Sequence, residues 1–452
     1  MLHWFRCDNC YSFVAKDSEQ MNGISMDDPS DRDSYTPIEP LARGKARIWQ
    51  FASIYGANAS GKSNMLKAIG SMFDNIASTR RDLVGERFLF DRSLNEKPIF
   101  CEMCFSLLKP GSNTQYNEYR YGYQLKTHKN IIDDKYDDKE LARYGKASEV
   151  LYEWLTIRDI HTDTDEDTEF IYYRDGKKLE FLNNYKDSPP AICLEKLFNK
   201  QKEEEIIPLV LRLAGEKEIE DQETDNIFSS IHAWCRKAIL MERVSEKEDT
   251  WNLRSAAALV HKDQDGYKDR FLKYLKTFDE CIVDVSVVCK GIDFELYIGH
   301  NMENVTSNND KVVFRSIYKE SYGTQKIAGM YPYFWDAMEN GGLLMIDEID
   351  IKLHPLVIRY LLEECQKSEK IQIIFSTHNL ITLDKRYMHM DETWFVEKRA
   401  NGKSSIFCLD TDSLGKDENE PEYINYRKPY LNGRFGAIPS QILDFQRGAE
   451  NE

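Results

Sequence analysis

Several features that define other protein classes are missing from this chain. Its 452 residues contain no apolar run of about 18 residues, the length that a helix needs to cross a membrane. The polar, acidic beginning of the sequence gives no signal peptide, so we expect a cytoplasmic protein. The 10 cysteines follow no regular framework, which indicates reduced thiols in a reducing compartment rather than a disulfide scaffold.

Positive charge is also in short supply. The chain has 60 Lys and Arg against 77 Asp and Glu, a formal net charge of -17. Phosphate contacts need clustered Lys and Arg, so this balance argues against a protein whose whole surface embraces nucleic acid. We interpret the short basic pairs Arg80-Arg81 and Arg427-Lys428 as solvated faces. The acidic runs Asp163 to Glu169 and Glu216 to Asp225 lack the spacing of a calcium loop and are interpreted in the same way.

Two Cys-x-x-Cys pairs, Cys7 with Cys10 and Cys101 with Cys104, raise the question of zinc. Both pairs fall in strand-like sequence, where residues three apart face opposite sides of a sheet. A knuckle-type zinc site needs a tight turn between its cysteines instead. We therefore favour buried thiols, with zinc as the alternative.

The chain does contain a complete phosphate-binding signature. Residues 56–63 read Gly-Ala-Asn-Ala-Ser-Gly-Lys-Ser and fit G-x-x-x-x-G-K-[ST] at every fixed position. Arg47 to Tyr55 reads as a buried strand and Asn64 to Phe73 as a helix, which is the context that the motif requires. The glycines let backbone N–H groups point at phosphate oxygens at the positive end of the helix. A chance glycine loop is the alternative.

The motif predicts the residues of a nucleotide site. Lys62 would reach the β and γ phosphates, and the Ser63 hydroxyl would ligate Mg²⁺. The predicted nucleotide-binding residues are the whole loop and the residue after it, namely Gly56, Ala57, Asn58, Ala59, Ser60, Gly61, Lys62, Ser63 and Asn64.

A second acidic motif lies near the other end of the chain. Residues 343–348 read Leu-Leu-Met-Ile-Asp-Glu, four apolar residues and then two acids. This pattern predicts Asp347 at the carboxyl end of a buried parallel strand, where open α/β sheets place their ligands. Asp347 would hold Mg²⁺, and Glu348 would orient or deprotonate the attacking water. A solvated acidic pair is the alternative, but four buried-type residues do not normally precede one.

Two further segments flank this strand. After a helix predicted from about Leu356 to Ser368, Ile371 to Phe375 reads as another apolar strand that ends in Ser376-Thr377-His378. Upstream, Glu320 to Gln325 reads Glu-Ser-Tyr-Gly-Thr-Gln and opens a helical segment. A lone histidine is more often structural, but His378 ends a strand close to the two acids in sequence.

Together these segments resemble the ABC-type ATPases of the SMC-like branch. The matching pieces are Asn9 with Ser12-Phe13, GANASGKSN at 56–64, ESYGTQ at 320–325, DEID with LHP at 347–355, and STH at 376–378. The resemblance implies an α/β fold, an ABC-type P-loop ATPase head with a flanking antiparallel β-sheet and an inserted, mainly helical lobe. It also implies ATP hydrolysis with Mg²⁺, in which Glu348 and His378 are catalytic.

In this family a signature segment binds the γ phosphate of ATP held by the opposite subunit, through a serine hydroxyl and a helix amino end. The resemblance therefore implies a homodimer closed around ATP, possible higher homo-oligomers, and a signature acting in trans. The signature residues here are Ser321, Gly323 and Gln325. The segment departs from the familiar LSGGQ because Tyr322 and Thr324 add bulk. No clear Q-loop glutamine or adenine-contacting residue is assigned. Gln124 is the nearest candidate in position, although it lies in an alternating, strand-like stretch.

Similarity extends beyond nucleotide chemistry. Phe88 to Asp91, Tyr119 to Tyr123 and the tail Tyr430 to Pro439 resemble bacterial ATPases of phage-defence operons, namely the ATPase subunit of the PARIS system, the Rlo-type ATPases and the abortive-infection ATPases of the AbiL kind. The resemblance implies an effector protein from the same operon, of the Toprim type or another nuclease, and a phage-encoded trigger. The chain itself carries no HNH-like or Toprim signature, so killing activity would come from a partner.

The patterns divide the chain into three parts. Residues 1–185 form the N-terminal part of the head, with the glycine loop and an antiparallel sheet, and residues 311–452 form its C-terminal part. Between them, residues 186–310 form an inserted, mainly helical lobe for a partner or a lid. With 125 residues and no sustained heptads, this insertion cannot make an extended coiled coil.

Two functions stay in view. In the first, a dimerising ATPase senses phage and controls a separate toxic effector. In the second, an SMC-like DNA repair or recombination ATPase acts directly on DNA. The acidic charge and the short insertion favour the first.

Overall fold

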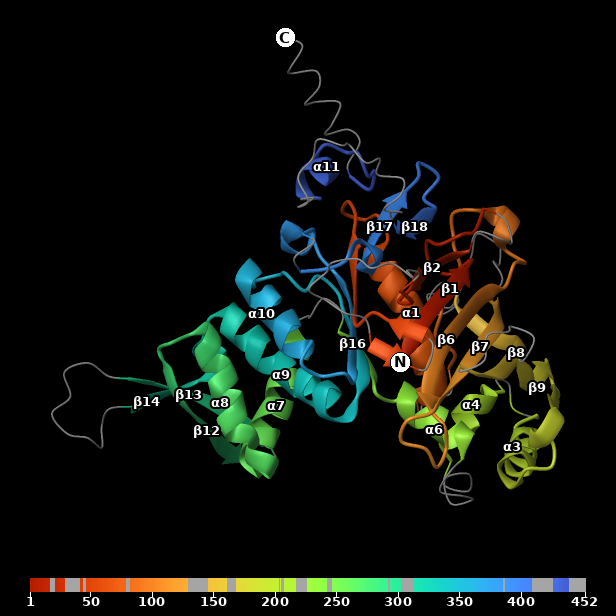
Figure 1. Cartoon of the computed structure of the whole chain (residues 1–452), viewed down its shortest axis with the longest axis horizontal. Helices are drawn as coiled ribbons and strands as arrows, with labels where there is room; N and C mark the ends of the chain where they lie inside the picture. The colour runs from red at the N-terminus through yellow and green to blue at the C-terminus, as the bar shows by residue number, and fades with distance from the viewer. Residues whose placement is uncertain are drawn as a thin grey trace, which may run out of the picture.

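The computed structural model describes residues 1–16, 21–28, 41–43, 46–78, 82–128, 145–160, 168–202, 204, 207–216, 226–241, 246–291, 293–301, 312–384, 387–408 and 426–438. Two large sheets and a three-stranded sheet are packed together with helices (Figure 1). This arrangement confirms the predicted α/β class. A two-stranded hairpin of β3 (Leu41–Arg43) and β4 (Ala46–Ile48) lies beside them.

A six-stranded sheet carries the motifs singled out in the sequence. Its order is β11-β15-β16-β5-β17-β18, and all neighbours are parallel except β17 and β18. The strands β5, β15 and β16 are almost entirely buried, as expected for a parallel sheet that is covered on both faces. The bounds are β11 (Ala238–Met241), β15 (Gly342–Ile346), β16 (Ile371–Ser376), β5 (Phe51–Tyr55), β17 (Thr393–Lys398) and β18 (Ser404–Cys408).

The predicted strand from Arg47 to Tyr55 is two strands. β4 ends at Ile48 and pairs with β3, whereas β5 begins at Phe51 and enters the large sheet. The side-chain amide of Gln50 donates to the carbonyl oxygens of Ser368 and Ile371, so this residue anchors the turn instead of extending the ladder.

The second large sheet is antiparallel in every pair and confirms the predicted flanking sheet. Its order is β10-β9-β8-β7-β6-β1-β2. Residues 169–181 form the hairpin of β9 and β10. The bounds are β10 (Lys178–Phe181), β9 (Glu169–Asp175), β8 (Ala147–Asp159), β7 (Tyr116–Thr127), β6 (Ile99–Leu108), β1 (Leu2–Asp8) and β2 (Asn22–Ser25).

Helix α1 (Lys62–Ala77) lies between the two large sheets. Its buried side chains, such as Met65, Leu66 and Ile69, belong to one core with residues of β1, β6 and β7 and with Met345 and Ile374 of the parallel sheet. The same core takes in α3 (Pro189–Lys200), α4 (Val210–Leu213) and α6 (Ile227–Cys235). One helix thus connects the glycine loop to both sheets.

A second core lies on the opposite side of the parallel sheet (Figure 1). There α7 packs against α9 and β13, and α8 packs against β12. This side contains α7 (Glu246–Lys262), α8 (Tyr267–Phe278), α9 (Tyr322–Asn340), α10 (Pro355–Cys365) and the antiparallel strands β12 (Ile282–Lys290), β13 (Asp293–Asn301) and β14 (Val312–Ser316).

The stretch 186–310, expected as one inserted lobe, is divided in space. Its first helices, α3, α4 and α6, join the core of the antiparallel sheet. β11 then becomes the edge strand of the parallel sheet beside β15, and only the part from α7 onward builds the second core. An edge strand pairs with its neighbour through backbone hydrogen bonds. The short sequence of β11 therefore does not predict which strand it joins.

The remaining elements are short. They are α11 (Arg427–Leu431), η1 (Arg92–Leu94), η3 (Asn183–Tyr185), η4 (Gln264–Gly266), η6 (Ile317–Lys319), η7 (Leu380–Thr382) and η8 (Met390–Glu392). Among the described helices, none combines the length and the apolar character required to cross a bilayer.

Candidate nucleotide-binding site

The loop between β5 and α1 has a backbone that requires its two fixed glycines. Gly56 has φ of 155° and Gly61 has φ of 119°. A Cβ atom at Gly56 would lie 2.4 Å from the carbonyl oxygen of Val396, and one at Gly61 would lie 2.7 Å from Oγ of Ser404. Neither position accepts a side chain, so the loop keeps the open backbone that a phosphate group needs.

Lys62 begins α1, and its ammonium group folds back over the loop. Nζ donates to the carbonyl oxygens of Gly56 at 2.9 Å and Ala57 at 3.1 Å. The side chain is buried, and this burial lowers the pKa of Lys62. Loop carbonyls are weak partners for a buried cation, so a phosphate oxygen would be a favourable replacement.

The other predicted loop residues differ in exposure. Asn58 and Ala59 are exposed at the tip, and Ala59 has φ of 60°, whereas Ser60 is buried and donates its N–H to the carbonyl of Ala57. Ser63 and Asn64 are half-buried in the first turn of α1. The loop is therefore held at its base and open at its tip.

Two serines from distant segments support the loop from behind. Ser12 accepts a hydrogen bond from the side-chain amide of Asn64 at 2.9 Å. Ser404, at the start of β18, donates its hydroxyl to the carbonyl of Ser60 at 2.6 Å and its N–H to the carbonyl of Ser12. Ser404 carries no sequence signal and was missed. Ser12 was named beforehand only as one of the residues that match the ABC-type ATPases, with no role assigned.

Asp347 and Glu348 follow β15, as the apolar run predicts. The hydroxyl of Ser376, at the end of neighbouring β16, donates to Oδ1 of Asp347 at 2.5 Å and accepts the N–H of Glu348 at 2.7 Å. Glu348 has φ of 50°, a strained conformation for a residue with a side chain. Strain of this kind clusters at functional sites, and here Ser376 holds it in place.

Asp350 is a second acid that sequence reasoning quoted but gave no role. Its Oδ1 accepts the hydroxyl of Thr377 at 2.6 Å and the N–H of His378 at 3.2 Å. The carboxylate therefore fixes the backbone from which the His378 side chain extends. Two carboxylates spaced three residues apart after one strand thus organise the end of the next strand.

His378, Lys62 and the acids form one electrostatic neighbourhood. Burial and the nearby Lys62 ammonium lower the pKa of His378, which keeps the ring neutral near pH 7. Asp347, Glu348 and Asp350 act in the opposite direction on both groups. The structure brings these five residues together at the carboxyl ends of β5, β15 and β16, where open α/β sheets bind ligands.

The segment at 320–325 forms the start of α9. Ser321 is the N-cap, and its Oγ accepts the N–H of Thr324 at 3.1 Å. The amide of Gln325 donates to the carbonyl of Glu320, so this side chain braces the turn instead of facing solvent. A Cβ at Gly323 would lie 3.0 Å from the carbonyl of Lys352.

The N-terminal part of α9 is tied to the chain that follows Asp347. Nζ of Lys326 donates to the carbonyl oxygens of Glu348, Ile349 and Ile351. The Lys352 ammonium lies 4.0 Å from the ring centre of Tyr322, whose side chain is 58% exposed. A ligand at the start of α9 would therefore contact the same segment that positions the acids.

The C-terminal tail packs against the strand that leads into the glycine loop. Tyr430 contacts the ring of Tyr55 at 5.9 Å between ring centres, and Phe435 and Ala437 join the same small core. The hydroxyl of Tyr55 donates to the carbonyl of Asn379, just beyond His378. The tail thus supports the site indirectly. Pro439, the last residue of the quoted tail, lies outside the described residues.

The cysteine pairs show both expected and unexpected features. Cys101 and Cys104 face opposite sides of β6, as predicted. Cys7 and Cys10 do not, because β1 ends at Asp8 and the turn brings Cys10 within 4.0 Å of Cys101, sulfur to sulfur. Burial raises the pKa of Cys101 well above its ordinary value, so Cys101 is a protonated buried thiol.

The remaining sequence predictions concern Gln124, the basic pairs and the acidic runs. Gln124 lies within β7, opposite Phe100 and Tyr152, which is an ordinary sheet position. The pair Arg80-Arg81 and most of the two acidic runs lie outside the described residues. Arg427 contacts Asp384 at 3.5 Å and is part of the fold rather than a free basic face.

The residues at this site fit Mg²⁺ and a nucleoside triphosphate. The amino end of α1 follows the glycine loop, and the Lys62 ammonium lies over the same loop, so two groups that bind phosphate oxygens occur together. Ser63 and Asp347 are the oxygen donors that Mg²⁺ prefers. When bound, Mg²⁺ would neutralise charge on the phosphate oxygens.

Comparisons with solved structures find SMC head domains, and no curated protein matches the chain. One is the SmcHead bound to the C-winged helix domain of ScpA, at 12% identity over 92% of this chain and 99% of that chain, with a TM-score of 0.45. A second is the SMC head domain from Thermotoga maritima, at 13% identity over 91% and 99%, with a TM-score of 0.40. A third is an Smc head domain with an extended coiled coil, bound to the C-terminal domain of ScpA derived from Pyrococcus furiosus. It is 14% identical over 91% of this chain and 97% of that chain, with a TM-score of 0.37.

A glycine loop between a central parallel strand and a helix, with an acidic pair after a second parallel strand, defines a P-loop nucleotide-binding fold. A family model described as "AAA domain, putative AbiEii toxin, Type IV TA system" matches residues 51–384, from the start of β5 to beyond His378. The chain therefore belongs to this family of AAA domains.

Proposed function

We propose that the protein binds ATP with Mg²⁺ at this site and hydrolyses it. The observation that carries the proposal is the convergence of four side chains at the carboxyl ends of parallel strands, beside the glycine loop. These side chains are Lys62, Asp347, Glu348 and His378. Such a group is costly to build into a fold, because it gathers a buried ammonium and half-buried carboxylates in one place.

Each side chain has a role that follows from its position. Lys62 exchanges the loop carbonyls for phosphate oxygens, and Asp347, oriented by Ser376, contributes an oxygen ligand to Mg²⁺. Glu348 accepts a proton from the attacking water, and the neutral His378 ring contacts the γ phosphate. Glu348→Gln should therefore lower the hydrolysis rate by about 10²-fold or more while ATP still binds.

We propose further that two copies close around two ATP molecules. Ser321 stands at the exposed amino end of α9 with the geometry of a helix cap, and a helix amino end is a binding site for phosphate oxygens. Tyr318 and Tyr322 beside it are 45% and 58% exposed. Large exposed aromatic side chains next to a polar cap are typical of a surface that a partner covers.

Mixing two inactive variants tests this arrangement. In Lys62→Ala the loop is defective, and in Ser321→Arg the partner's contribution is defective, so each variant alone should be inactive. A 1:1 mixture should recover about a quarter of the parental ATPase rate, because half of the dimers are mixed and each has one intact site of two. A mixture of Lys62→Ala with Glu348→Gln is the matched control. One chain supplies both residues to the same site, so each of the two sites in a mixed dimer lacks one of them.

The same count of intact sites predicts that the control mixture stays inactive. If Lys62 and Glu348 act in one site of one chain, a mixed dimer contains no intact site and the rate stays at zero. Recovery in the mixture that contains Ser321→Arg, but not in the control mixture, therefore shows that Ser321 acts in trans. Equal recovery in both mixtures, or no recovery in either mixture, would contradict a site that two subunits share.

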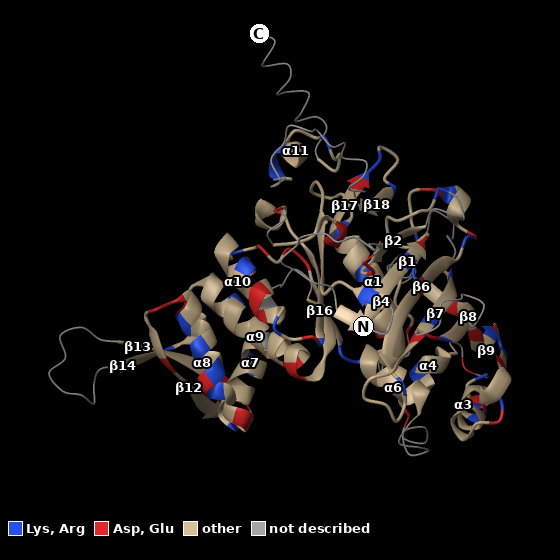
Figure 2. Ribbon diagram, viewed as in Figure 1, with Lys and Arg blue, Asp and Glu red and all other residues tan. Residues whose placement is uncertain are grey.

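We propose that the biological role is control of a separate toxic effector in defence against phage. The family description names a toxin of a type IV toxin–antitoxin system, and the resemblance to phage-defence ATPases points to the same setting. Asp and Glu are interspersed with Lys and Arg along the ribbon, and the net charge is -17, which does not favour a DNA-wrapping role (Figure 2).

The second core offers a surface for such an effector. On β14, Val312, Val313 and Phe314 are 37%, 40% and 40% exposed, and β14 is the last strand of its sheet. A sheet edge with exposed apolar side chains is suited to pairing with another chain. The effector surface is therefore assigned to the part of the chain beyond α7.

The decisive experiment is to purify the complex from its native operon with ATP present and to measure its mass for the parent and for Glu348→Gln. A homo-oligomer that carries a second gene product supports effector control. A dimer that gains affinity for DNA with ATP would replace it with a DNA repair or recombination ATPase. Toxicity of the chain expressed alone, abolished by Lys62→Ala, would instead place the toxin in this protein.

A further inference from the structure

A group of metal-ligating side chains lies in the antiparallel sheet, outside the nucleotide site. His3, Cys104 and Glu118 each offer a ligand atom, and these atoms all lie within 4.8 Å of one another. All three side chains are buried, with exposures of 2%, 1% and 4%. Imidazole, thiol and carboxyl groups rarely meet in a core without a shared partner.

The sheet places these residues from three neighbouring strands, β1, β6 and β7. Cys104 pairs with Trp4 of β1 and with Arg120 of β7, so Glu118, two residues before Arg120, faces the same side as Cys104. In a regular strand His3 would face away from this side. The register of β1 shifts between Leu2 and Trp4, and this bulge turns His3 toward the other two.

Two ligand atoms of the group are buried without satisfied bonds. Among the described residues, neither Nε2 of His3 nor Oε1 of Glu118 has a hydrogen-bond partner. Buried polar atoms are normally paired, so a concentration of unpaired ones indicates a missing ion or ordered water. Nε of Arg120 is 3.5 Å from Oε1 of Glu118, too far for a good hydrogen bond.

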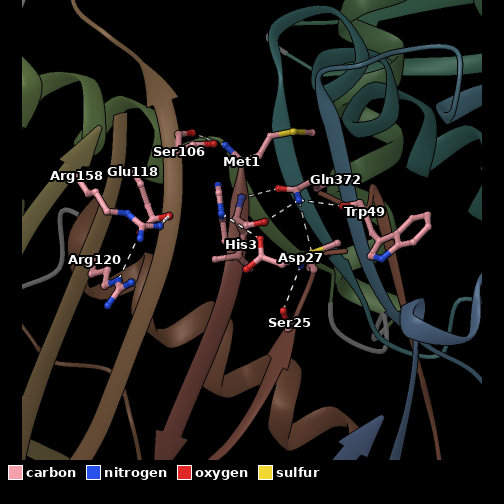
Figure 3. Close-up of polar contacts among 12 residues, drawn as sticks. Met1, His3, Ser25, Asp27, Trp49, Ser106, Glu118, Arg120, Arg158 and Gln372 are labelled. Carbon is pink, nitrogen blue, oxygen red and sulfur yellow. Dashed lines mark hydrogen bonds and ion pairs between the residues drawn. The ribbon is translucent and has the colours of Figure 1, made fainter. Parts of the chain in front are cut away.

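Neighbouring groups orient the ligands as they do around protein-bound metals. Nδ1 of His3 lies 3.1 Å from Oδ1 of Asp27, so a carboxylate stands behind the ring on the side away from Nε2 (Figure 3). Arg158 holds the second oxygen of Glu118 at 2.5 Å. Figure 3 shows His3 between Glu118 and Asp27, with Arg158 on the far side of Glu118. A carboxylate behind the histidine and a donor behind the glutamate complete the pattern.

We propose that His3, Cys104 and Glu118 bind a zinc ion that joins β1, β6 and β7. A mixed nitrogen, sulfur and oxygen set suits Zn²⁺, whereas Ca²⁺ and Mg²⁺ require oxygen alone. Zinc ligands lie about 2.0–2.3 Å from the metal, so binding draws the three side chains slightly inward. A water molecule takes the fourth position.

Metal analysis of the untagged full-length protein tests the proposal. We expect one zinc per chain after purification without chelators, and the metal should be lost in Cys104→Ser and in His3→Ala. Cys101→Ser is the matched control, since Cys101 lies on the same strand and is equally buried but faces the thiol group with Cys10. This variant should keep its zinc.

Cobalt titration of the unmodified chain avoids the risk that a variant fails to fold. A thiolate-to-cobalt charge-transfer band that zinc displaces, together with a lower melting temperature after chelation, supports the site. Absence of bound zinc and of this band would overturn it and would identify the unpaired atoms as water ligands. Zinc retained by Cys104→Ser but lost from Cys101→Ser would also overturn it.

Discussion

Two groups of buried charges in this protein have opposite designs. In the antiparallel sheet, Glu153 is fully buried and accepts hydrogen bonds from the hydroxyls of Tyr121 and Tyr172, from the N–H of Val210 and from the Arg174 guanidinium. At the glycine loop, Lys62 is also buried, but within the described ranges its ammonium donates to two loop carbonyls while three acids lie near it.

The difference shows what each group is for. Every lone pair of Glu153, on β8, has a donor, and the partners come from β7, β9 and the start of α4, so the network holds these elements in one arrangement. The group around Lys62 instead holds a buried ammonium on neutral loop carbonyls, with three acids nearby. A closed network stabilises the fold, whereas an open one keeps charge available for binding.

The largest effect that would sharpen this contrast is expected for Lys62→Ala. ATPase activity should fall by about 10²- to 10³-fold, because the cation that contacts the phosphates is gone. The free energy of unfolding without nucleotide should change by less than about 1 kcal/mol, since a buried cation with weak partners is removed. Steady-state kinetics and urea denaturation measure the two quantities, with Lys67→Ala on the same helix as control. A large loss of stability would show that the loop network is structural.

Glu153→Gln should show the opposite behaviour. Unfolding should become easier by about 3 kcal/mol, because the buried Arg174 loses its counter-charge. Nucleotide affinity of the folded protein should stay unchanged. Glu149→Gln on the same strand, where the Lys126 pair is about half exposed, should alter stability by less than about 1 kcal/mol. Equal effects of the two changes would contradict the special position of Glu153.

A smaller effect is expected for Ser376→Ala. This hydroxyl donates to Asp347 and accepts the N–H of Glu348, so its loss should reduce ATPase activity by about 10-fold through misplaced acids. Lowered affinity for Mg²⁺ should accompany the loss, which a titration of activity with Mg²⁺ measures. An unchanged Mg²⁺ dependence would mean that Ser376 supports the strand only.

The smallest effect concerns pH. Glu392 is buried just before β17, and burial raises its pKa to about 8. Its protonated form is favoured in the folded state, so its contribution to stability is present at low pH and is lost as the pH rises through about 8. In Glu392→Gln the melting temperature should therefore fall less between about pH 5 and pH 8 than in the parent. The exposed Glu397→Gln should follow the parent curve, and parallel curves for all three proteins would refute the assignment.

Much of the parallel sheet could be predicted from the sequence. The apolar runs at 343–346 and 371–375 are continuous because both faces of their strands are buried, and each is followed by the polar residues of the site. The antiparallel sheet was predicted from alternation for the same kind of local reason. The break at Gln50 was missed, because it depends on carbonyl oxygens more than 300 positions away.

The candidate site was predicted only in part. Lys62, Asp347 and His378 belong to motifs in which spacing along the chain determines position. Asp350 and Ser404 act through contacts across strands, and nothing next to them in sequence marks that role. His3 and Cys104 meet through a bulge in β1, which the amino-acid pattern does not show.

By itself the sequence determined the glycine loop, the acidic strand and the order in which they occur, since these depend on residues that are neighbours along the chain. Tertiary structure decided which distant groups complete them: the serines behind the loop, the assignment of β11 to the parallel sheet, and the joining of His3, Cys104 and Glu118. The physical reason is that strand pairing and register are set by packing between segments far apart in sequence, and local propensity contains little information about that choice.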